Sequence, residues 1–270
     1  MSTLHRLEVL VLKSNKLFGQ VTKPLAQEKS SCAFPRAQII DISSNSFYGA
    51  LPQDQWFKKL ESMIFRDPNM SLIMDHELPQ TSSTYKYTAA VTYKGRDTTF
   101  EKIQRTLVFI DFSNNAFNGS IPAAIGELGL LHGLNISHNF LTGTIPSQLS
   151  HLHQLEALDL SSNELSGEIP QELVSLDFLT TLNLSNNRLV GSIPMSPHFL
   201  TFSNRSFMGN NGLCGPPLSK ECINTTTTNV VSHRSDKKYV DIMLFMFSGL
   251  GFGVGFAIAI VVIWRKPIRK

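Results

Sequence analysis

The chain repeats one pattern of apolar and polar positions with a period of 24 residues. Four copies read LVFIDFSNNAFNGSIP, LHGLNISHNFLTGTIP, LEALDLSSNELSGEIP and LTTLNLSNNRLVGSIP, and their central asparagines are Asn115, Asn139, Asn163 and Asn187. A unit this short cannot bury its own apolar face, so it must stack on further copies of itself. The period therefore predicts a solenoid.

Each unit has the form L-x-x-L-x-L-x-x-N-x-L-x-G-x-I-P. In its first half, apolar residues alternate with other residues, which is the period of a strand with one buried face. Strands from neighbouring units are expected to pair in parallel along the inner face of the solenoid. The glycine permits a turn that a side chain would obstruct, and the proline fixes φ and lacks a backbone donor.

The repeated asparagine predicts a ladder of hydrogen bonds. A side-chain amide has no place in a dry core unless its polar groups are satisfied. An asparagine that recurs in every unit can bond the backbone of its own turn and of the adjacent turn. We expect Asn115, Asn139, Asn163 and Asn187 to form such a ladder through the stack.

An insertion interrupts the repeats. Two earlier units match around Asn15 and Asn45, with Ala37 where the first leucine of the second unit is expected. Nearly three periods separate Asn45 from Asn115, so an island of non-repeat sequence lies between them, at 61–106. Its run at 85–95 is rich in aromatic and β-branched residues, which predicts a strand before a glycine turn.

The sequence after the last repeat predicts a cap and a membrane span. Cys214 and Cys222 can close a short loop or remain free thiols, and their spacing alone does not decide between the two. Residues 242–264 contain no formally charged side chain. As a helix they would span about 35 Å, against about 30 Å of bilayer hydrocarbon. Within this span, two overlapping G-x-x-x-G pairs suit close contact between helices, although glycine is also frequent in membrane helices that do not associate. The pairs comprise Gly249, Gly251, Gly253 and Gly255.

Charge and glycosylation motifs bear on the topology. The basic tail at 265–270 favours a cytosolic C-terminus, whereas a net charge of +3 is too small to indicate a nucleic-acid partner. Six N-x-S/T sequons precede the span, and they place residues 1–241 outside the cell if the chain enters the secretory route. The sequons are Asn69, Asn118, Asn135, Asn183, Asn204 and Asn224. The first residues contain no apolar signal segment, so we expect an N-terminal truncation.

The L-x-G-x-I-P half-unit resembles that of the plant extracellular leucine-rich-repeat class. An island followed by four repeats, a cap and a membrane span resembles the plant receptor-like proteins, in particular the tomato Verticillium-resistance type, whose island commonly ends in a Tyr…Val-Thr…Lys-Gly run. The resemblance implies an α/β-type leucine-rich-repeat solenoid with a parallel inner sheet, 24-residue repeats and one transmembrane helix. The cap phrase G-N-x-G-L-C-G-x-P-L…C also implies a disulfide between Cys214 and Cys222.

The expected organisation has seven parts. They are two repeats at 1–60, truncated at the N-terminus; the island at 61–106; four repeats at 107–200; the cysteine cap at 201–230; a juxtamembrane segment at 231–241; the membrane helix at 242–264; and a cytosolic tail at 265–270.

Candidate contact residues lie at the variable positions around the core leucines, on the inner face. The candidates are Phe109, Asp111, Asn114, His138, Asp159, Thr181 and Asn186. Phe109 is the preferred contact, because it is interpreted as an exposed aromatic next to the island. The row of Asp and Asn between the core residues resembles a metal or catalytic ladder, but repeated short polar residues on adjacent strands are interpreted as mainly structural.

No catalytic Ser–His–Asp or Cys–His arrangement follows from the spacing, and we predict no enzymatic activity, no cofactor and no metal. The resemblance implies a single-pass plasma-membrane receptor without a kinase, with its N-terminus outside and its C-terminus in the cytosol. Such a receptor perceives a pathogen- or peptide-derived ligand and signals in plant defence through recruited kinases. An adaptor receptor-like kinase would bind the membrane helix, and a leucine-rich-repeat co-receptor kinase would meet the last repeats.

Alternative functions stay open at this point. They are a developmental peptide receptor of the same architecture, a secreted inhibitor of a cell-wall-degrading enzyme, and a truncated fragment without function. The island contributes to ligand recognition or is a tolerated insertion.

Overall fold

The computed structural model describes residues 4, 6–21, 34–66, 89–93, 96–100 and 106–222. The chain divides into two compact units, Met1–Ile223 and Asn224–Lys270. The predicted juxtamembrane segment, membrane helix with its glycine pairs and cytosolic tail all lie outside the described residues. Among the residues that are described, no helix has the length and apolar character needed to cross a membrane.

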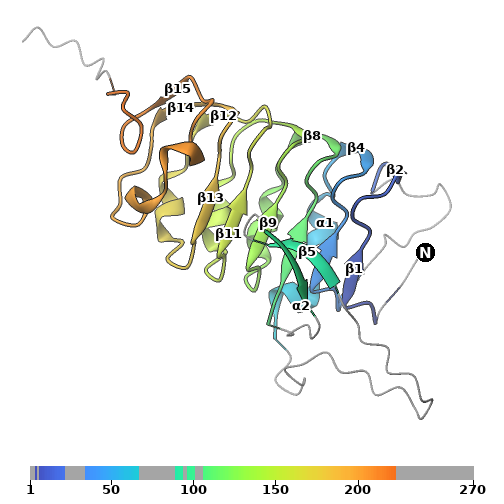
Figure 1. Cartoon of the computed structure of the whole chain (residues 1–270). Coiled ribbons are helices and arrows are strands. Elements are labelled where there is room, and N and C mark those ends of the chain that lie inside the picture. Colours follow the sequence, from blue (N-terminus) through green and yellow to red (C-terminus); the bar gives the residue numbers. More distant parts are fainter. Residues whose placement is uncertain are drawn as a thin grey trace, which may run out of the picture. The chain divides into compact units, whose positions relative to one another are not determined.

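The first halves of the repeats form one parallel sheet, called the inner sheet below (Figure 1). Its six strands follow one another in the order β1, β3, β7, β9, β11, β13. They comprise Val9–Val11, Ile39–Asp41, Phe109–Asp111, Gly133–Asn135, Ala157–Asp159 and Thr181–Asn183. Ala157 pairs with Gly133 on one side and Thr181 on the other, so equivalent positions of successive repeats are in register. The predicted parallel inner sheet is confirmed.

The second halves of the repeats also form parallel strands, which the sequence had suggested only as turns. A four-stranded sheet has the order β10, β8, β4, β2, and a three-stranded sheet has the order β12, β14, β15. Their bounds are Phe140–Thr142, Ala116–Ser120, Ser46–Ala50 and Phe18–Gly19, then Ser166–Glu168, Arg188–Ser192 and Gly212–Cys214. In β4, β8, β12 and β14 the repeat glycine lies within the strand at a positive φ, for example 76° at Gly119. Gly19 instead ends β2, and Gly143 directly follows β10. Glycine adopts a positive φ without the steric cost that a side chain brings.

Short helices connect the second strand of one repeat to the inner strand of the next. Three are 3-10 helices, η1 (Ala123–Glu127), η2 (Ser147–His151) and η3 (Gln171–Ser175). Each begins directly after the repeat proline, which suits the first turn because it has no N–H to satisfy. In the repeat before the island, α1 (Asp54–Phe57) and α2 (Glu61–Ile64) take this place.

The core runs through the stack as columns of leucine and isoleucine. Leu134, Leu158 and Leu182 of successive inner strands are all buried, as are the leucines and isoleucines of the second halves of the last four repeats. An aromatic cluster fills the end next to the island, where Phe112 packs against Trp56 and Phe117. Apolar burial of this kind stabilises at about 25 cal/mol per Å², so the repeats stabilise one another only when stacked.

The asparagine ladder forms as predicted. The amide nitrogen of Asn139 donates to the carbonyls of Ile136 and Ser137 in its own turn and of Phe112 in the preceding repeat, at 3.1–3.2 Å. Its Oδ1 accepts the N–H of Phe117 at 3.0 Å. Asn45, Asn115, Asn163 and Asn187 repeat this arrangement.

The cap continues the repeat further than the sequence suggested. Asn210 donates to the carbonyl of Leu184 and accepts the N–H of Leu189, both at 3.0 Å, as a ladder asparagine does. Phe199, Phe202 and Phe207 precede Asn210 at the same spacings at which Leu176, Leu179 and Leu184 precede Asn187, and all six are buried. Phe199 begins the short helix η4 (Phe199–Thr201), Phe202 directly follows it, and Phe207 directly follows η5 (Asn204–Ser206). A disulfide joins Cys214 and Cys222.

The described residues of the island include α2 and an antiparallel hairpin of β5 (Ala89–Tyr93) and β6 (Arg96–Phe100). A strand was predicted at 85–95, and β5 lies within it. The flanks of the island meet on one repeat, because the N–H of Leu130 donates to the Met63 carbonyl and that of His132 to the Val108 carbonyl. Met63, within the range assigned to the island, is buried in the core.

Candidate functional site

The last residues of five inner strands, β3 to β13, form a row of Asp and Asn that bonds the turn after each strand. Oδ1 of Asp111 accepts the N–H of Ser113 at 2.9 Å and its hydroxyl at 2.6 Å. The same pair of bonds joins Asp41 to Ser43, Asn135 to Ser137, Asp159 to Ser161 and Asn183 to Ser185. The residue type at this position is therefore explained by the fold.

The row is also linked from strand to strand. The amide nitrogen of Asn135 lies 3.2 Å from Oδ2 of Asp111, and that of Asn183 lies 3.3 Å from Oδ2 of Asp159. These bonds agree with the structural interpretation of the row. Within the described part of the chain, no group of acidic, histidine or cysteine side chains is arranged to hold a metal ion.

Burial on the inner face changes along the sheet. Phe109 is 2% exposed and Asp111 is 1% exposed, whereas their equivalents in β11 and β13 are partly exposed. Figure 1 shows the hairpin β5–β6 in front of the sheet between β1 and β9, where β3 and β7 lie. The low exposure of Phe109 and Asp111 shows that the inner face is covered at β7.

The prediction that Phe109 is an exposed aromatic contact is therefore wrong. Its position in the repeat does place it on the inner face, but that face is closed at β7 and the ring is buried. Sequence periodicity assigns a residue to a face and says nothing about what covers the face.

The cover changes the electrostatics of Asp111. Burial raises the pKa of its carboxyl from 3.8 to about 6, because desolvation disfavours the charged form. The nearby carboxylate of Asp41 raises the pKa further, and the hydrogen bonds from Ser113 and Asn135 oppose the shift. Asp111 is thus a buried group and is not presented to a ligand on the inner face.

Three other predicted contacts share a backbone conformation. Asn114, His138 and Asn186 have φ of 52°, 52° and 55°, in the left-handed region. The equivalent residues of the other repeats are serines with the same conformation. Asn and His are enriched at such positions for conformational reasons, so their presence here does not by itself indicate a ligand. Their side chains are nonetheless exposed.

The remaining inner face is open to solvent at the end near the cap. We call it the open inner surface, and it comprises Asn135, His138, Ala157, Asp159, Thr181, Asn183 and Asn186, all partly or fully exposed. Met208, which the sequence reasoning missed, lies at its border, since its carbonyl accepts the N–H of Asn186 and its side chain is exposed. The ladder spacing of Asn210 was the signal that could have found it.

The sequons fall in different surroundings. Asn118 and Asn204 have exposed side chains. Asn135 and Asn183 belong to the hydrogen-bonded row of the inner sheet. Asn69 and Asn224 lie outside the described residues.

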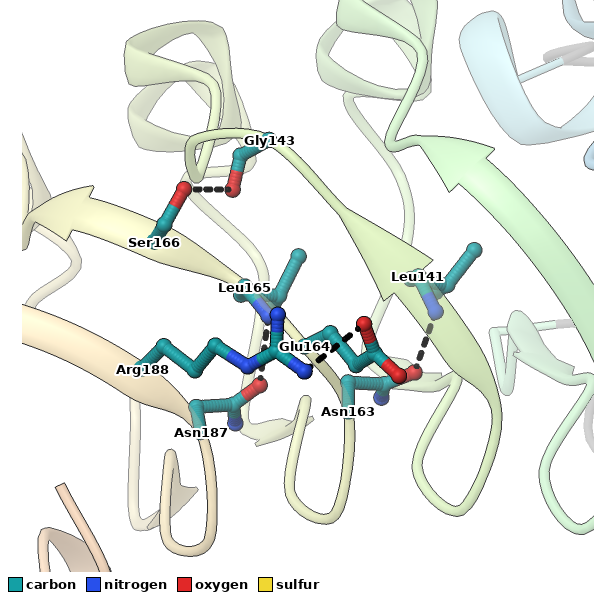
Figure 2. A network of polar contacts seen from close by, with 8 residues as sticks. All are labelled: Leu141, Gly143, Asn163, Glu164, Leu165, Ser166, Asn187 and Arg188. Carbon is teal, nitrogen blue, oxygen red and sulfur yellow. Dashed lines mark hydrogen bonds and ion pairs between the residues drawn. The ribbon is translucent and has the colours of Figure 1, made fainter.

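The second strands carry a separate surface with both charged and apolar side chains. Figure 2 shows Arg188 on β14 paired with Glu164 at 3.0 Å, beside the ladder bonds of Asn163 and Asn187. Both charged side chains are exposed, so the ion pair contributes less than about 1 kcal/mol. The ladder, and not this ion pair, holds the neighbouring repeats together.

Stacked parallel strands joined by an asparagine ladder define a leucine-rich-repeat protein, and comparisons with known families agree. The family models described as "Leucine rich repeat" match residues 129–189 and 106–128. The chain is similar to plant receptor-like proteins. Receptor-like protein 36 of Arabidopsis thaliana is 44% identical over 143 residues, which cover 50% of this chain and 18% of that protein. Receptor-like protein 38 of the same plant is 36% identical over 151 residues, which cover 48% of this chain and 18% of that protein.

The chain therefore contains leucine-rich repeats and is similar to plant receptor-like proteins, and it spans less than a fifth of the length of these two relatives. The matched family models and these two relatives are described as leucine-rich-repeat and receptor-like proteins, and none of these descriptions names an enzyme. Among solved structures, the BIR3–SERK2 complex from Arabidopsis thaliana contains a chain 46% identical to this one. The match covers 41% of this chain and 58% of that chain, with a TM-score of 0.39.

Proposed function

We propose that the chain is the membrane-anchored part of a plant receptor-like protein without a kinase, which perceives a peptide or a pathogen-derived molecule in plant defence. The observation that carries the proposal is the open inner surface of the receptor-like repeats. Its side chains are short, polar and partly exposed, whereas the equivalent residues at β3 and β7 are buried. A ligand that reaches the inner face of the described repeats meets this surface.

The proposed partners are inferred from the same similarity to plant receptor-like proteins. A leucine-rich-repeat co-receptor kinase meets the last repeats and the cap, where the open inner surface ends. An adaptor receptor-like kinase binds the membrane helix at 242–264 through its glycine pairs. The repeats are extracellular, the tail is cytosolic, and the protein is a glycoprotein of the plasma membrane. The tomato Verticillium-resistance type is the subclass that we infer from the island motif.

The topology is tested on the full chain, expressed in plant cells with a tag at each end. We expect protease added to intact protoplasts to remove the N-terminal tag and to spare the C-terminal tag. Protection of both tags contradicts the extracellular placement. A secreted inhibitor instead releases the N-terminal tag into the medium.

Ligand perception is tested by the association of the chain with a co-receptor kinase ectodomain, with and without a fungal culture filtrate. We expect filtrate-dependent association that Thr181→Trp abolishes, because the indole blocks the open inner surface. Val190→Trp, an exposed position on β14, is the matched control and should retain association. Association that is equally strong without the filtrate and that persists in Thr181→Trp contradicts the proposal. A developmental receptor responds to a plant peptide extract and not to the filtrate.

A further inference from the structure

Two exposed aromatic side chains flank one sequon on the four-stranded sheet. Phe140 on β10 is 56% exposed and Tyr48 on β4 is 50% exposed. The strand between them, β8, carries Asn118, which pairs with Phe140 on one side and with Ala50 on the other. Tyr48 pairs with Ala116 on the same strand.

These side chains share one face of the sheet. Along β8, Phe117 is buried and its neighbour Asn118 is exposed, as alternation in a strand requires. The same alternation exposes Tyr48 and Ala50 on β4. Asn118 therefore projects from the middle of an exposed patch that has an aromatic ring on each flanking strand. Exposed apolar patches commonly mark a surface that something else covers.

The side chain of Asn118 is available for the attachment of an N-linked glycan. This residue begins the sequon Asn118-Gly119-Ser120, and its side chain forms no hydrogen bond with the described residues. An N-linked glycan is bulky and solubilising. Attached here, its first sugars lie between the strands that carry Tyr48 and Phe140 and can cover both rings.

The two inner-sheet sequons are in the opposite situation. In Asn135, Oδ1 accepts two bonds from Ser137, and Nδ2 lies 3.2 Å from the buried carboxylate of Asp111. Asn183 makes the same contacts with Ser185 and Asp159. A sugar on Nδ2 would press against the next strand, about 4.8 Å away. At Asn135 it would also disturb a hydrogen-bond donor to the buried carboxylate of Asp111, which is costly.

We propose that N-glycosylation of the described repeats is confined to the exposed face of the four-stranded sheet of second strands. Asn118 carries a glycan that covers Phe140 and Tyr48, and Asn135 and Asn183 stay unmodified in the folded protein. Exposed Asn204 in the cap is also an acceptor. The proposal rests on the extracellular placement proposed above.

The chemistry requires a lipid-linked oligosaccharide diphosphate as donor. The bond between the anomeric carbon and the diphosphate oxygen breaks, and its electron pair leaves with the diphosphate. The anomeric carbon forms a new bond to Nδ2, and one amide proton is released. Transfer precedes folding, so a chain modified at Asn135 must then fold without the native contacts of that amide.

Site occupancy is measured on the full chain purified from plant cells, by glycosidase release in ¹⁸O-labelled water and mass spectrometry of the peptides. We expect labelled aspartate at 118 and 204 and unlabelled asparagine at 135 and 183. Asn118→Gln and Ser120→Ala should each remove one glycan from the intact mass. Asn135→Gln and Ser137→Ala, the matched controls, should remove none.

The outcomes separate this proposal from the proposed function. The division of sites is overturned if Asn204 carries a glycan and Asn118 does not. It is also overturned if Asn135 or Asn183 carries a glycan. Either result leaves the extracellular placement intact. No glycan at either Asn118 or Asn204 overturns both. Whether the glycan covers the rings of Phe140 and Tyr48 is tested separately, by the binding of an apolar dye. Asn118→Gln should increase binding of an apolar dye, and adding Phe140→Thr should reverse the increase; no increase overturns the cover.

Discussion

Oδ1 of Asn210 accepts the backbone N–H of Leu189 at 3.0 Å, so the asparagine ladder passes from the last repeat into the cap. The cap is thus a modified repeat in which phenylalanines replace the core leucines. This arrangement closes the apolar end of the stack with the same hydrogen bonds that hold the repeats together.

The ladder should dominate the stability of the stack. Asn163→Ala leaves the buried N–H of Leu141 without its partner and removes one of the two amide donors to the Ile136 carbonyl. We expect a loss of about 1–3 kcal/mol in the free energy of unfolding, which is the cost of an unsatisfied buried group. Asn15→Ala is the control, because Asn15 is exposed and its side-chain amide donates only to carbonyls of its own turn. Equal losses in urea unfolding for the two variants would refute the ladder's role.

Asp111 should make stability depend on pH. Its pKa is raised from 3.8 to about 6 in the folded chain, chiefly by burial, so the folded state binds more protons than the unfolded state between these values. The free energy of unfolding therefore falls as pH rises from 3.8 through about 6, by on the order of 3 kcal/mol. We therefore expect the melting temperature of Asp111→Asn, measured relative to that of wild type, to be higher at about pH 7 than at about pH 4.

Asp159→Asn is the comparison for this effect. Its Oδ1 can still accept the bonds from Ser161, as Oδ1 of Asn135 accepts those from Ser137, but it removes the acceptor of the Asn183 amide. It therefore reports the cost of that interstrand bond on the uncovered part of the inner sheet. A gain for Asp111→Asn that does not change with pH would contradict the burial argument.

His138 should be replaceable by glycine but not by valine. Its φ of 52° lies in the left-handed region. A side chain costs roughly 1–2 kcal/mol there, and a β-branched residue tolerates it least. Thermal unfolding should show His138→Val clearly destabilised and His138→Gly close to wild type. Equal destabilisation by both would show that the imidazole, and not the backbone, matters at this position.

Phe109 should behave as a core residue. Phe109→Ala is expected to cost about 3–5 kcal/mol, as for other buried phenylalanines. Thr181→Ala, at the equivalent position of β13, should change stability by less than about 0.5 kcal/mol because Thr181 is partly exposed. An unchanged unfolding midpoint for Phe109→Ala would mean that the inner face at β7 is open in solution.

Much of the architecture was predictable because every repeat solves the same local problem. The spacing of Leu134, Ile136 and Asn139 recurs, and it predicts the inner strand and the ladder in each unit. The second strands of the repeats, such as the one that contains Gly119, were not predicted because the sequence pattern of a repeat glycine resembles a turn signal. The cap was underestimated because phenylalanine replaces leucine and the interval from Asn187 to Asn210 differs from the repeat period.

The candidate site was less predictable. Phe109 and Thr181 occupy the same position in their repeats, yet one is buried and the other is partly exposed. His138 and Asn186 were selected as variable contacts, but their backbone conformation explains their presence. The membrane helix and the tail remain predictions.

The sequence by itself determined the repeat, its register and its ladder, because these depend on side chains at fixed local spacings. The tertiary structure decided which inner-face residues are open, how the island closes on the repeats and which sequon amides are already bonded. Those properties depend on atoms that are distant in sequence, and burial and hydrogen-bond satisfaction are set by neighbours in space.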